Sequence, residues 1–336
     1  MDYQRLGSSG LDVSVVCLGT MMFGDRTTRD EAIDIVAHAR DHGVNFIDTA
    51  DVYSKGESER ITGAAIGATR SQWILATKVG NAMVAGDRNA TGLSRRWIVA
   101  ACDASLARLA TDYIDIYYFH LDDVATPLEE SIAAVGDLMR AGKIRYVGVS
   151  HFRGWRIAEV DRVCAALGVP RPVVCQPYYN LLNRMPEVEI LPACDHFGIG
   201  VASYSPIARG VLTGKYAPGV VPGDSRAARN DRRMMETEFR EESFAIAAKL
   251  KAHAERTGRT PTQFALAWLW ANRIVSSVIA GPRTLAQWTD YVDAVGTAWS
   301  AEDEALVDSL VPPGHPSTPG YTDPRYPFFG RRLATK

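Results

Sequence analysis

Short runs of apolar, strand-forming residues alternate with longer stretches of helical periodicity along most of this 336-residue chain. The expected strands cover residues 15–18, 44–47, 73–77, 114–119, 144–149, 173–175, 200–204 and 274–280. The expected helices cover residues 29–42, 57–68, 94–109, 127–141, 153–166, 186–197, 242–257, 261–271, 284–294 and 301–311. Eight strand–helix units in one chain of this length predict an α/β fold, the (β/α)8 or TIM barrel. A doubly wound sheet is the alternative, but no G-x-G-x-x-G sequence follows any expected strand.

Several segments lie outside the eight predicted strand–helix units. Residues 3–6 and 11–14 indicate an N-terminal β-hairpin around a Gly/Ser turn. Residues 208–240 are rich in Gly, Pro, Asp and Arg, which predicts a long functional loop after the seventh strand. The last helix is additional to the eight units, and a tail rich in Pro, Gly and aromatic residues follows it over residues 312–336. We expect all of these segments to belong to one domain, residues 1–336.

The charge balance and the cysteines indicate which binding partners and which cellular compartment to expect. The chain has 37 basic and 39 acidic residues, which gives no electrostatic reason to expect nucleic acid or an anionic membrane as partner. No basic region followed by an apolar core opens the chain, and the apolar helical run 264–271 is far shorter than the roughly 20 residues that span a bilayer. The five cysteines are spread widely and form no C-x-x-C pair. We therefore expect a cytoplasmic protein in a reducing compartment, and no metal site is predicted.

Three consecutive expected strands each end in a polar side chain. Asp48 follows the second strand, Lys78 follows the third, and His120 follows the fourth, while Tyr53 lies just beyond Asp48. The C-terminal ends of parallel strands meet at one face of a barrel, where active sites are built. Neighbouring strands lie about 5 Å apart, so Asp48 and Lys78 are predicted to form a salt bridge near the floor of a pocket.

Tyr53 is the predicted general acid of this constellation. A phenol with a pKa of about 10 is a poor acid at neutral pH, but the nearby ammonium of Lys78 is expected to lower that pKa. Such a phenol can protonate a developing alkoxide, while His120 shares the proton or hydrogen-bonds the substrate oxygen. No side chain can donate a hydride, so a reduced nicotinamide is implied. Each residue alone is usually structural, and the prediction rests on all four meeting at matching strand ends.

At this point the chain resembles the aldo-keto reductase superfamily, from the N-terminal hairpin to at least Tyr291. The motifs that carry the resemblance are residues 18–20 (LGT), 46–53 (FIDTADVY) with 57–59 (ESE), 76–78 (ATK), 112–116 (DYIDI) ahead of His120, 142–150 (GKIRYVGVS), 204–210 (YSPIARG) and 214–216 (GKY). The resemblance implies a (β/α)8 fold, NADP(H) as cofactor, and reversible reduction of aldehydes or ketones to alcohols. The catalytic tetrad of that family maps onto Asp48, Tyr53, Lys78 and His120.

The resemblance also implies how NADPH is held. Ser150 and Gln176 match residues that bind the nicotinamide carboxamide, and Tyr204 matches the aromatic residue that stacks on the nicotinamide ring. The residues that match the pyrophosphate loop are Ser205, Pro206, Ile207, Ala208, Gly210 and Lys215. Arg226 is expected at the adenosine end, and those expected around the 2′-phosphate and adenine are Gly281, Pro282, Arg283, Gln287 and Asp290. The remaining cofactor contacts are expected from Gly19, Thr20, Met21, Asp48 and His151.

The sequence departs from the family pattern at three places. His151 stands where Asn is common, which weakens the carboxamide contact there, and Tyr291 replaces a frequent Asn near adenine. Residues 21–23 are Met, Met and Phe where many relatives have Trp, and they are either an adaptable pocket wall or core filling. The predicted substrate contacts are Met22, Phe23, Tyr53 and His120.

The sequence therefore predicts an NADPH-dependent carbonyl reductase that acts on a small-molecule carbonyl substrate, as a monomer or a homo-oligomer. One alternative is a cofactor-binding regulatory module similar to the β subunits of potassium channels, which lack the tetrad histidine. Another is a dehydrogenase that works in the oxidation direction with NAD, against which Arg283 argues. Four aromatic residues in the tail, Tyr321, Tyr326, Phe328 and Phe329, predict that it covers the substrate pocket, although packing on the barrel wall or on a partner subunit competes with that interpretation.

Overall fold

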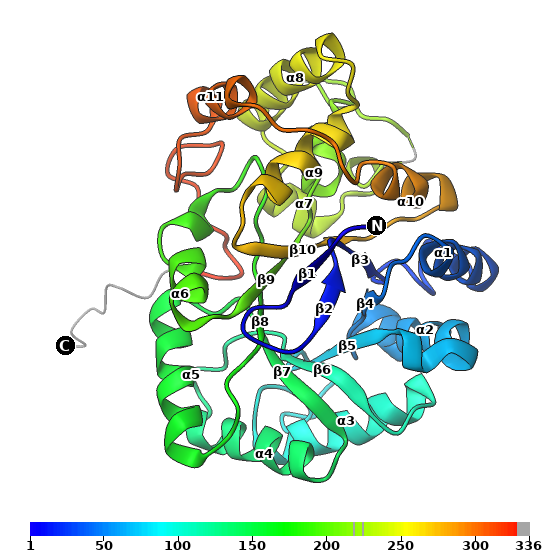
Figure 1. The fold of residues 1–336 in the computed structure, drawn as a ribbon, viewed down its shortest axis with the longest axis vertical. Helices are drawn as coiled ribbons and strands as arrows, with labels where there is room; N and C mark the ends of the chain where they lie inside the picture. The colour runs from blue at the N-terminus through cyan, green and yellow to red at the C-terminus, as the bar shows by residue number, and fades with distance from the viewer. Residues whose placement is uncertain (218, 224, 328–336) are drawn as a thin grey trace.

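Eight parallel strands close into a barrel in the computed structural model, which describes residues 1–217, 219–223 and 225–327 (Figure 1). The strand order around the barrel is β10-β3-β4-β5-β6-β7-β8-β9. The strands are β3 (Val16–Gly19), β4 (Phe46–Asp48), β5 (Ile74–Val79), β6 (Ile114–Phe119), β7 (Ile144–Ser150), β8 (Val174–Gln176), β9 (Gly200–Tyr204) and β10 (Val275–Ala280). The predicted (β/α)8 fold is confirmed, and each strand lies where the sequence predicted it.

The helices surround the barrel, and α1 to α6 follow one another around it while α8 to α11 gather at one side (Figure 1). They are α1 (Arg29–Asp41), α2 (Glu57–Ile66), α3 (Arg95–Leu109), α4 (Leu128–Arg140), α5 (Gly154–Leu167), α6 (Ile190–Phe197), α7 (Arg232–Thr237), α8 (Glu241–Arg256), α9 (Pro261–Ala271), α10 (Leu285–Val292) and α11 (Ala301–Leu310). The short 3-10 helices are η1 (Tyr53–Gly56), η2 (Gly67–Gln72), η3 (Met185–Glu187), η4 (Ala208–Thr213) and η5 (Ala227–Arg229).

Alternation along each strand divides the core into two layers. Inward-facing residues such as Phe46, Ala76 and Ile116 form a small cluster inside the barrel, whereas their neighbours, such as Ile47 and Leu75, pack against the surrounding helices. Side chains on a strand alternate between its two faces, so Asp48 and Lys78 share the inward parity of Phe46 and Ala76. The two charged groups are thereby delivered to the inside of the barrel at its C-terminal end.

The predicted N-terminal hairpin closes the other end of the barrel. Its strands β1 (Tyr3–Arg5) and β2 (Asp12–Ser14) pair antiparallel, and Leu6 and Val13 are completely buried in the inner cluster. Gly7 has a φ of 58°, and a Cβ there would lie 2.4 Å from the Gly198 carbonyl oxygen, so only glycine fits this contact. The hairpin therefore closes the N-terminal end of the barrel, and the cavity opens at the C-terminal end.

Two predicted segments differ from the structure by more than two residues. The segment 208–240, predicted as loop, contains η4, η5 and α7, the last of which begins where the Asp231 side chain accepts a hydrogen bond from the Met234 N–H. The helix predicted over 186–197 begins only at Ile190, because the turn around Pro186 is a 3-10 helix that ends before it. Both errors come from short helical turns, which give little periodic signal.

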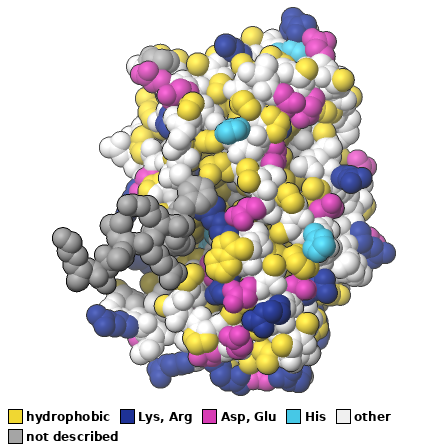
Figure 2. All heavy atoms as spheres, turned by 90° about the vertical axis from the view of Figure 1, so that its left-hand side faces the viewer, with side chains coloured by type: hydrophobic (Ala, Val, Ile, Leu, Met, Phe, Trp, Pro, Cys, Tyr) yellow, Lys and Arg dark blue, Asp and Glu magenta, His cyan; other side chains and the backbone are white. Residues whose placement is uncertain are grey.

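The described residues contain no helix that is long and apolar enough to cross a membrane, and no cluster of His, Cys, Asp and Glu side chains arranged to hold a metal ion. Lys and Arg side chains are interspersed with Asp and Glu on the face shown in Figure 2, so no single sign of charge dominates it. This agrees with the formal net charge of −2.

Candidate active site

A cavity of about 460 Å³ lies at the C-terminal end of the barrel. It is lined by most of the sequence-predicted site residues: Gly19, Thr20, Met21, Met22, Asp48, Tyr53, His120, His151, Gln176, Tyr204, Ser205, Pro206, Ile207, Gly210, Lys215, Arg226, Gly281, Arg283, Gln287 and Asp290. Those that do not line it are Phe23, Lys78, Ser150, Ala208 and Pro282. The residues predicted from several strand ends and loops are thus brought to one place.

Asp48, Lys78 and Tyr53 form a chain of polar contacts at the cavity floor. The Lys78 ammonium donates to Asp48 Oδ1 at 2.5 Å and to the Thr49 carbonyl oxygen at 2.6 Å. It also lies 3.4 Å from the Tyr53 hydroxyl oxygen. The side chain of Lys78 is completely buried and that of Asp48 nearly so. The predicted salt bridge is present and is shielded from solvent.

Burial, rather than the ammonium, governs the titration of Tyr53. Loss of hydration raises the pKa of the phenol above its usual value, and Lys78 only partly opposes this rise. The prediction that Lys78 lowers the pKa of Tyr53 below its usual value is therefore wrong in net direction. Burial by itself would lower the pKa of the Lys78 ammonium. Interactions with Asp48 and Tyr53 outweigh burial, so the pKa of Lys78 is raised. At neutral pH the site holds a protonated phenol beside a protonated amine.

His120 faces Tyr53 across the cavity. Their rings meet edge to face with centroids 5.9 Å apart, and the Nδ1 atom of His120 is buried without a partner among the described residues. Burial, and then the positive field of Lys78, lower the pKa of His120 well below its usual value. The imidazole is therefore neutral, and a buried unpartnered ring nitrogen beside a phenol is a group that a substrate oxygen can satisfy.

Gln176 and Ser150 support this floor from the neighbouring strands. The Gln176 amide donates to Asp48 Oδ2 at 3.0 Å, and the Ser150 hydroxyl donates to the Gln176 carbonyl oxygen at 2.9 Å. Ser150 is buried behind Gln176 and does not reach the cavity. Ser150 thus binds the backbone of Gln176, and the predicted contacts of both residues to a cofactor stay predictions.

Left-handed backbone shapes the wall after β9. Ser205, Ala208 and Arg209 have φ values of 58°, 48° and 50°, and Gly210 has a φ of 95°. Such a run gives the wall a concave backbone, in which the Ala208 and Gly210 N–H groups already donate to the Ser205 and Ile207 carbonyl oxygens at 2.9 Å. The Lys215 side chain lies over Gly210, where an added Cβ would be 3.1 Å from Lys215 Cε. This wall fits a pyrophosphate, although Ala208 itself packs into the core.

The far end of the cavity is built by the segment that opens α10. The Arg283 N–H donates to Gln287 Oε1 at 2.9 Å, and the Arg283 carbonyl oxygen accepts from the Thr27 hydroxyl at 2.9 Å. Arg226 reaches the same cavity while it pairs with Asp231 at 2.9 Å. Pro282 is buried and shapes the turn without lining the cavity. Among the described residues, six Arg and Lys side chains and three carboxylates line the cavity, an excess of positive charge that favours an anionic occupant such as NADPH.

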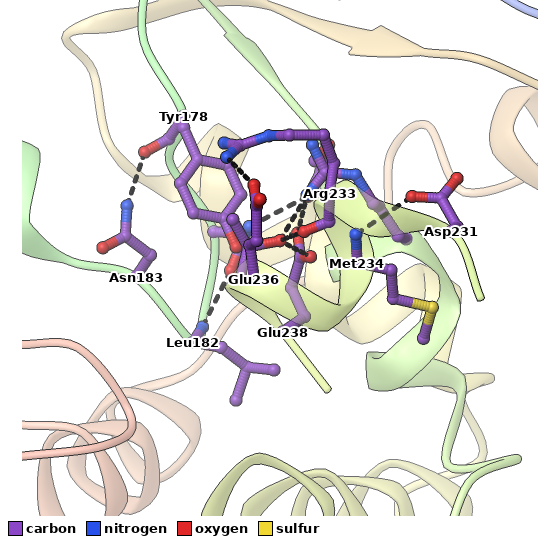
Figure 3. Close-up of polar contacts among 12 residues, drawn as sticks. Tyr178, Leu182, Asn183, Asp231, Arg233, Met234, Glu236 and Glu238 are labelled. Carbon is purple, nitrogen blue, oxygen red and sulfur yellow. Dashed lines mark hydrogen bonds and ion pairs between the residues drawn. The ribbon is translucent and has the colours of Figure 1, made fainter. Parts of the chain in front are cut away.

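Sequence reasoning missed a buried network that extends from the cavity wall after β9. Arg209 donates to Glu238 Oε1 at 2.5 Å and to the Thr237 hydroxyl at 2.8 Å, and the Tyr178 hydroxyl donates to the same carboxylate at 2.8 Å. Figure 3 shows Tyr178 and Glu238 together beside α7. Arg209 lies inside the 204–210 motif, which was the available signal, but its partner 29 residues later gave none.

Residues 21–23 lie in two different environments, the cavity wall and the core. Met21 and Met22 line the cavity, with 39% and 6% of their surface exposed, so they form part of its wall. Phe23 is completely buried in the core between the barrel and the helices. The prediction that Phe23 contacts the substrate is therefore not supported, because its side chain packs away from the cavity.

The tail reaches the cavity through Tyr326. Its ring stacks on the ring of His151, with centroids 3.7 Å apart and planes inclined by 10°. His151 has a φ of 61° and also meets Tyr204 edge to face at 5.5 Å. Burial lowers the pKa of His151 to about 3, so the ring is neutral. Tyr326 lies where the sequence predicted the tail to cover the pocket, while Phe328 and Phe329 lie outside the described residues.

Comparison with known proteins identifies a family and several relatives of this chain. The model of the aldo/keto reductase family matches residues 15–312. A probable voltage-gated potassium channel subunit beta from Arabidopsis thaliana is 39% identical over 301 residues, which cover 88% of this chain and 91% of the relative. The uncharacterised oxidoreductase YrpG from Bacillus subtilis (strain 168) is 33% identical over 329 residues, 95% of this chain and 98% of the relative. Versiconal hemiacetal acetate reductase from Aspergillus parasiticus is 33% identical over 293 residues, 80% and 85% of the two chains.

Proposed function

The chain belongs to the aldo/keto reductase family, and we propose that it reduces an aldehyde or ketone to an alcohol with NADPH as hydride donor. The observation that carries the proposal is the meeting of Lys78, Tyr53 and His120 at the floor of one cavity. A protonated phenol beside a neutral imidazole can receive a carbonyl oxygen and protonate it. The family and its oxidoreductase relatives support the same chemistry.

Each member of the tetrad has a separate task in this proposal. Tyr53 holds the proton that the carbonyl oxygen takes up, a contribution typically worth ~10²–10⁴-fold in rate. Lys78 stays cationic because Asp48 pairs with it, and its charge stabilises the phenolate left on Tyr53. His120 orients the carbonyl by a hydrogen bond from its neutral ring. The reduced nicotinamide, when bound, supplies the hydride.

The cavity beyond the tetrad contains groups suited to hold NADPH. Tyr204 offers a ring for the nicotinamide, and Lys215 beside the left-handed segment 205–210 offers a cation for the pyrophosphate. Arg283 would bind the 2′-phosphate, with Arg226 near the adenosine. Substrate contacts are proposed from Met22, Tyr53 and His120. The single domain over residues 1–336 and the cytoplasmic location stay predictions.

A regulatory module is the second candidate, because relatives named as potassium channel β subunits are 39% and 34% identical to this chain. His120 argues for the enzyme, since the family resemblance implies that channel β subunits lack the tetrad histidine. A dehydrogenase that acts in the oxidation direction would use the same residues in reverse. A reductase would turn over carbonyl substrates steadily with NADPH, and a dehydrogenase would oxidise alcohols faster than it reduces carbonyls. A regulatory module would bind the cofactor without steady turnover.

We therefore expect steady consumption of NADPH with a panel of aldehydes and ketones, and slower consumption of NADH. In Arg283→Ala the preference for NADPH should fall by roughly 10- to 100-fold, because a charge-assisted hydrogen bond is worth about 1.5–3 kcal/mol. Arg96→Ala removes a solvent-exposed arginine outside the cavity and serves as the matched control.

Tight NADPH binding without turnover of any carbonyl would favour the regulatory module. An unchanged preference in Arg283→Ala would assign the 2′-phosphate to another residue, with Arg226 as the next to test.

A further inference from the structure

The tail holds Arg325 at the cavity that contains Tyr53 and His120. Asp323 accepts two hydrogen bonds from the Arg233 guanidinium, at 3.0 and 2.6 Å, and one from the Arg325 N–H at 3.0 Å. The Tyr326 N–H donates to the Asp323 carbonyl oxygen at 3.1 Å, which closes a turn over these residues. A tail turn fixed by a bidentate ion pair places the Arg325 side chain reproducibly at the cavity.

Arg325 differs from the other arginines at this part of the cavity in its partners. Arg209 and Arg233 each face a carboxylate within hydrogen-bond distance. The Arg325 guanidinium donates to Asn81 Oδ1 at 2.8 Å and, within residues 1–217, 219–223 and 225–327, contacts no carboxylate. It also lies over the Tyr326 ring, 5.7 Å from its centroid. A cation at a cavity mouth whose partners here are a neutral amide and a neutral ring keeps its capacity to bind an anion.

Asn81 adds a neutral hydrogen-bonding group next to Arg325. It follows β5 three residues after Lys78 and lines the same cavity as Arg325. Its Oδ1 accepts from Arg325, so its amide N–H groups stay available as further donors. The neighbouring lining residues Val52 and Tyr53 carry no charge at neutral pH, and the field of Arg325 contributes to the lowered pKa of His120. The positive charge therefore acts on the end of the cavity where the carbonyl is proposed to react.

We propose that the carbonyl substrate carries a carboxylate, which Arg325 and Asn81 bind while the carbonyl lies against Tyr53 and His120. This proposal rests on the reductase function proposed above and specifies its substrate class. In the reaction the carbonyl carbon gains a hydride from the reduced cofactor and the oxygen gains the Tyr53 proton. An oxo acid thereby becomes a hydroxy acid, and NADPH becomes NADP⁺. The carboxylate itself does not react and serves only to position the carbonyl.

The test compares two aldehydes of nearly equal shape, 4-formylbenzoate and 4-formylbenzamide. Arg325→Gln should lower the ratio of kcat/KM for the benzoate over the benzamide by roughly 10- to 100-fold, because one charge-assisted interaction is lost. Using the ratio cancels the different intrinsic reactivity of the two aldehydes. Arg325→Lys should keep part of the preference, and Arg96→Gln, which removes an exposed charge outside the cavity, should leave the ratio within about twofold of wild type.

A binding experiment separates this proposal from the reductase function. The unreactive 4-methylbenzoate is titrated calorimetrically into the wild-type protein and Arg325→Gln, each saturated with NADP⁺. Weaker binding in Arg325→Gln supports the carboxylate site even if the wild type reduces neither aldehyde, an outcome that would count against the reductase function alone. Equal binding in both proteins, or a benzoate-to-benzamide ratio that Arg325→Gln leaves unchanged, overturns the proposal. A loss of NADPH affinity in Arg325→Gln with an unchanged ratio also overturns it, because Arg325 then contacts the cofactor.

Discussion

At the residue scale, the properties of Tyr53 depend on its burial as much as on its neighbours. Its hydroxyl lies 3.4 Å from the Lys78 ammonium, yet loss of hydration raises the pKa of the phenol. The residue types and their strand-end positions were predictable from sequence, because alternation fixes which side chains point into a barrel. The net direction of the pKa shift was not predictable, because it depends on how completely distant segments such as the tail cover the site.

These shifts predict a flat pH profile for carbonyl reduction. Tyr53 must be protonated, and since its pKa is raised it keeps its proton at every pH below that value. His120 must be neutral, and since its pKa is lowered it stays neutral at every pH above that value. We therefore expect kcat/KM for an uncharged aldehyde to change little from about pH 6 to about pH 9. A decline across neutral to alkaline pH would mean that Lys78 outweighs burial and brings the pKa of Tyr53 below its usual value. A decline below about pH 7 that is absent in His120→Gln would mean that the imidazole titrates normally.

At the element scale, helix α2 and helix α3 approach so closely that one position admits only glycine. A Cβ on Gly63 would lie 2.2 Å from the Leu109 carbonyl oxygen, where neither backbone can yield without moving a helix. Gly67, one turn later, has a φ of −50° and a ψ of −48°, and a Cβ there would meet nothing within 4 Å. Both glycines follow the same helical pattern in the sequence, so only the packing of the two helices distinguishes them.

The contrast gives a matched pair of variants. Gly63→Ala should lower the free energy of unfolding by about 1–3 kcal/mol, the usual cost of forcing extra atoms into a packed interface. Gly67→Ala should leave it unchanged or raise it by about 0.4–1 kcal/mol, since alanine restricts the unfolded chain. Urea unfolding followed by circular dichroism measures both. Equal effects of the two substitutions would contradict the close approach of α2 to Leu109.

Elements with strong periodicity were predicted well, whereas short turns were not. The eight barrel strands and most helices appear in the sequence as runs whose apolar spacing reflects burial on one face. Helix α7 is too short to show such a period, and its start depends on the side-chain cap from Asp231. The 3-10 turn at Pro186 likewise depends on local backbone geometry. Prediction therefore succeeded where burial imposes a pattern and failed where a single hydrogen bond or turn decides.

At the scale of the whole molecule, the closed barrel brings together residues that are far apart in sequence. Asp48, Lys78 and His120 come from β4, β5 and the end of β6, which are neighbours around the barrel, so the sequence already indicated their meeting. The tail is different, since Asp323 pairs with Arg233 across 90 positions. No periodicity or motif marks that pair, so Arg325 and its proposed role could be recognised only in the folded chain.

The measurement that tests the central claim most directly is the steady-state rate of NADPH-dependent aldehyde reduction by wild type and Tyr53→Phe. Loss of the hydroxyl should lower kcat by roughly 10²–10⁴-fold, because the carbonyl oxygen then has no positioned acid, while the NADPH dissociation constant stays within about twofold. Tyr113→Phe, which removes a hydroxyl outside the cavity, should retain the wild-type rate. A folded Tyr53→Phe protein that binds NADPH and reduces the aldehyde at close to the wild-type rate would contradict the account.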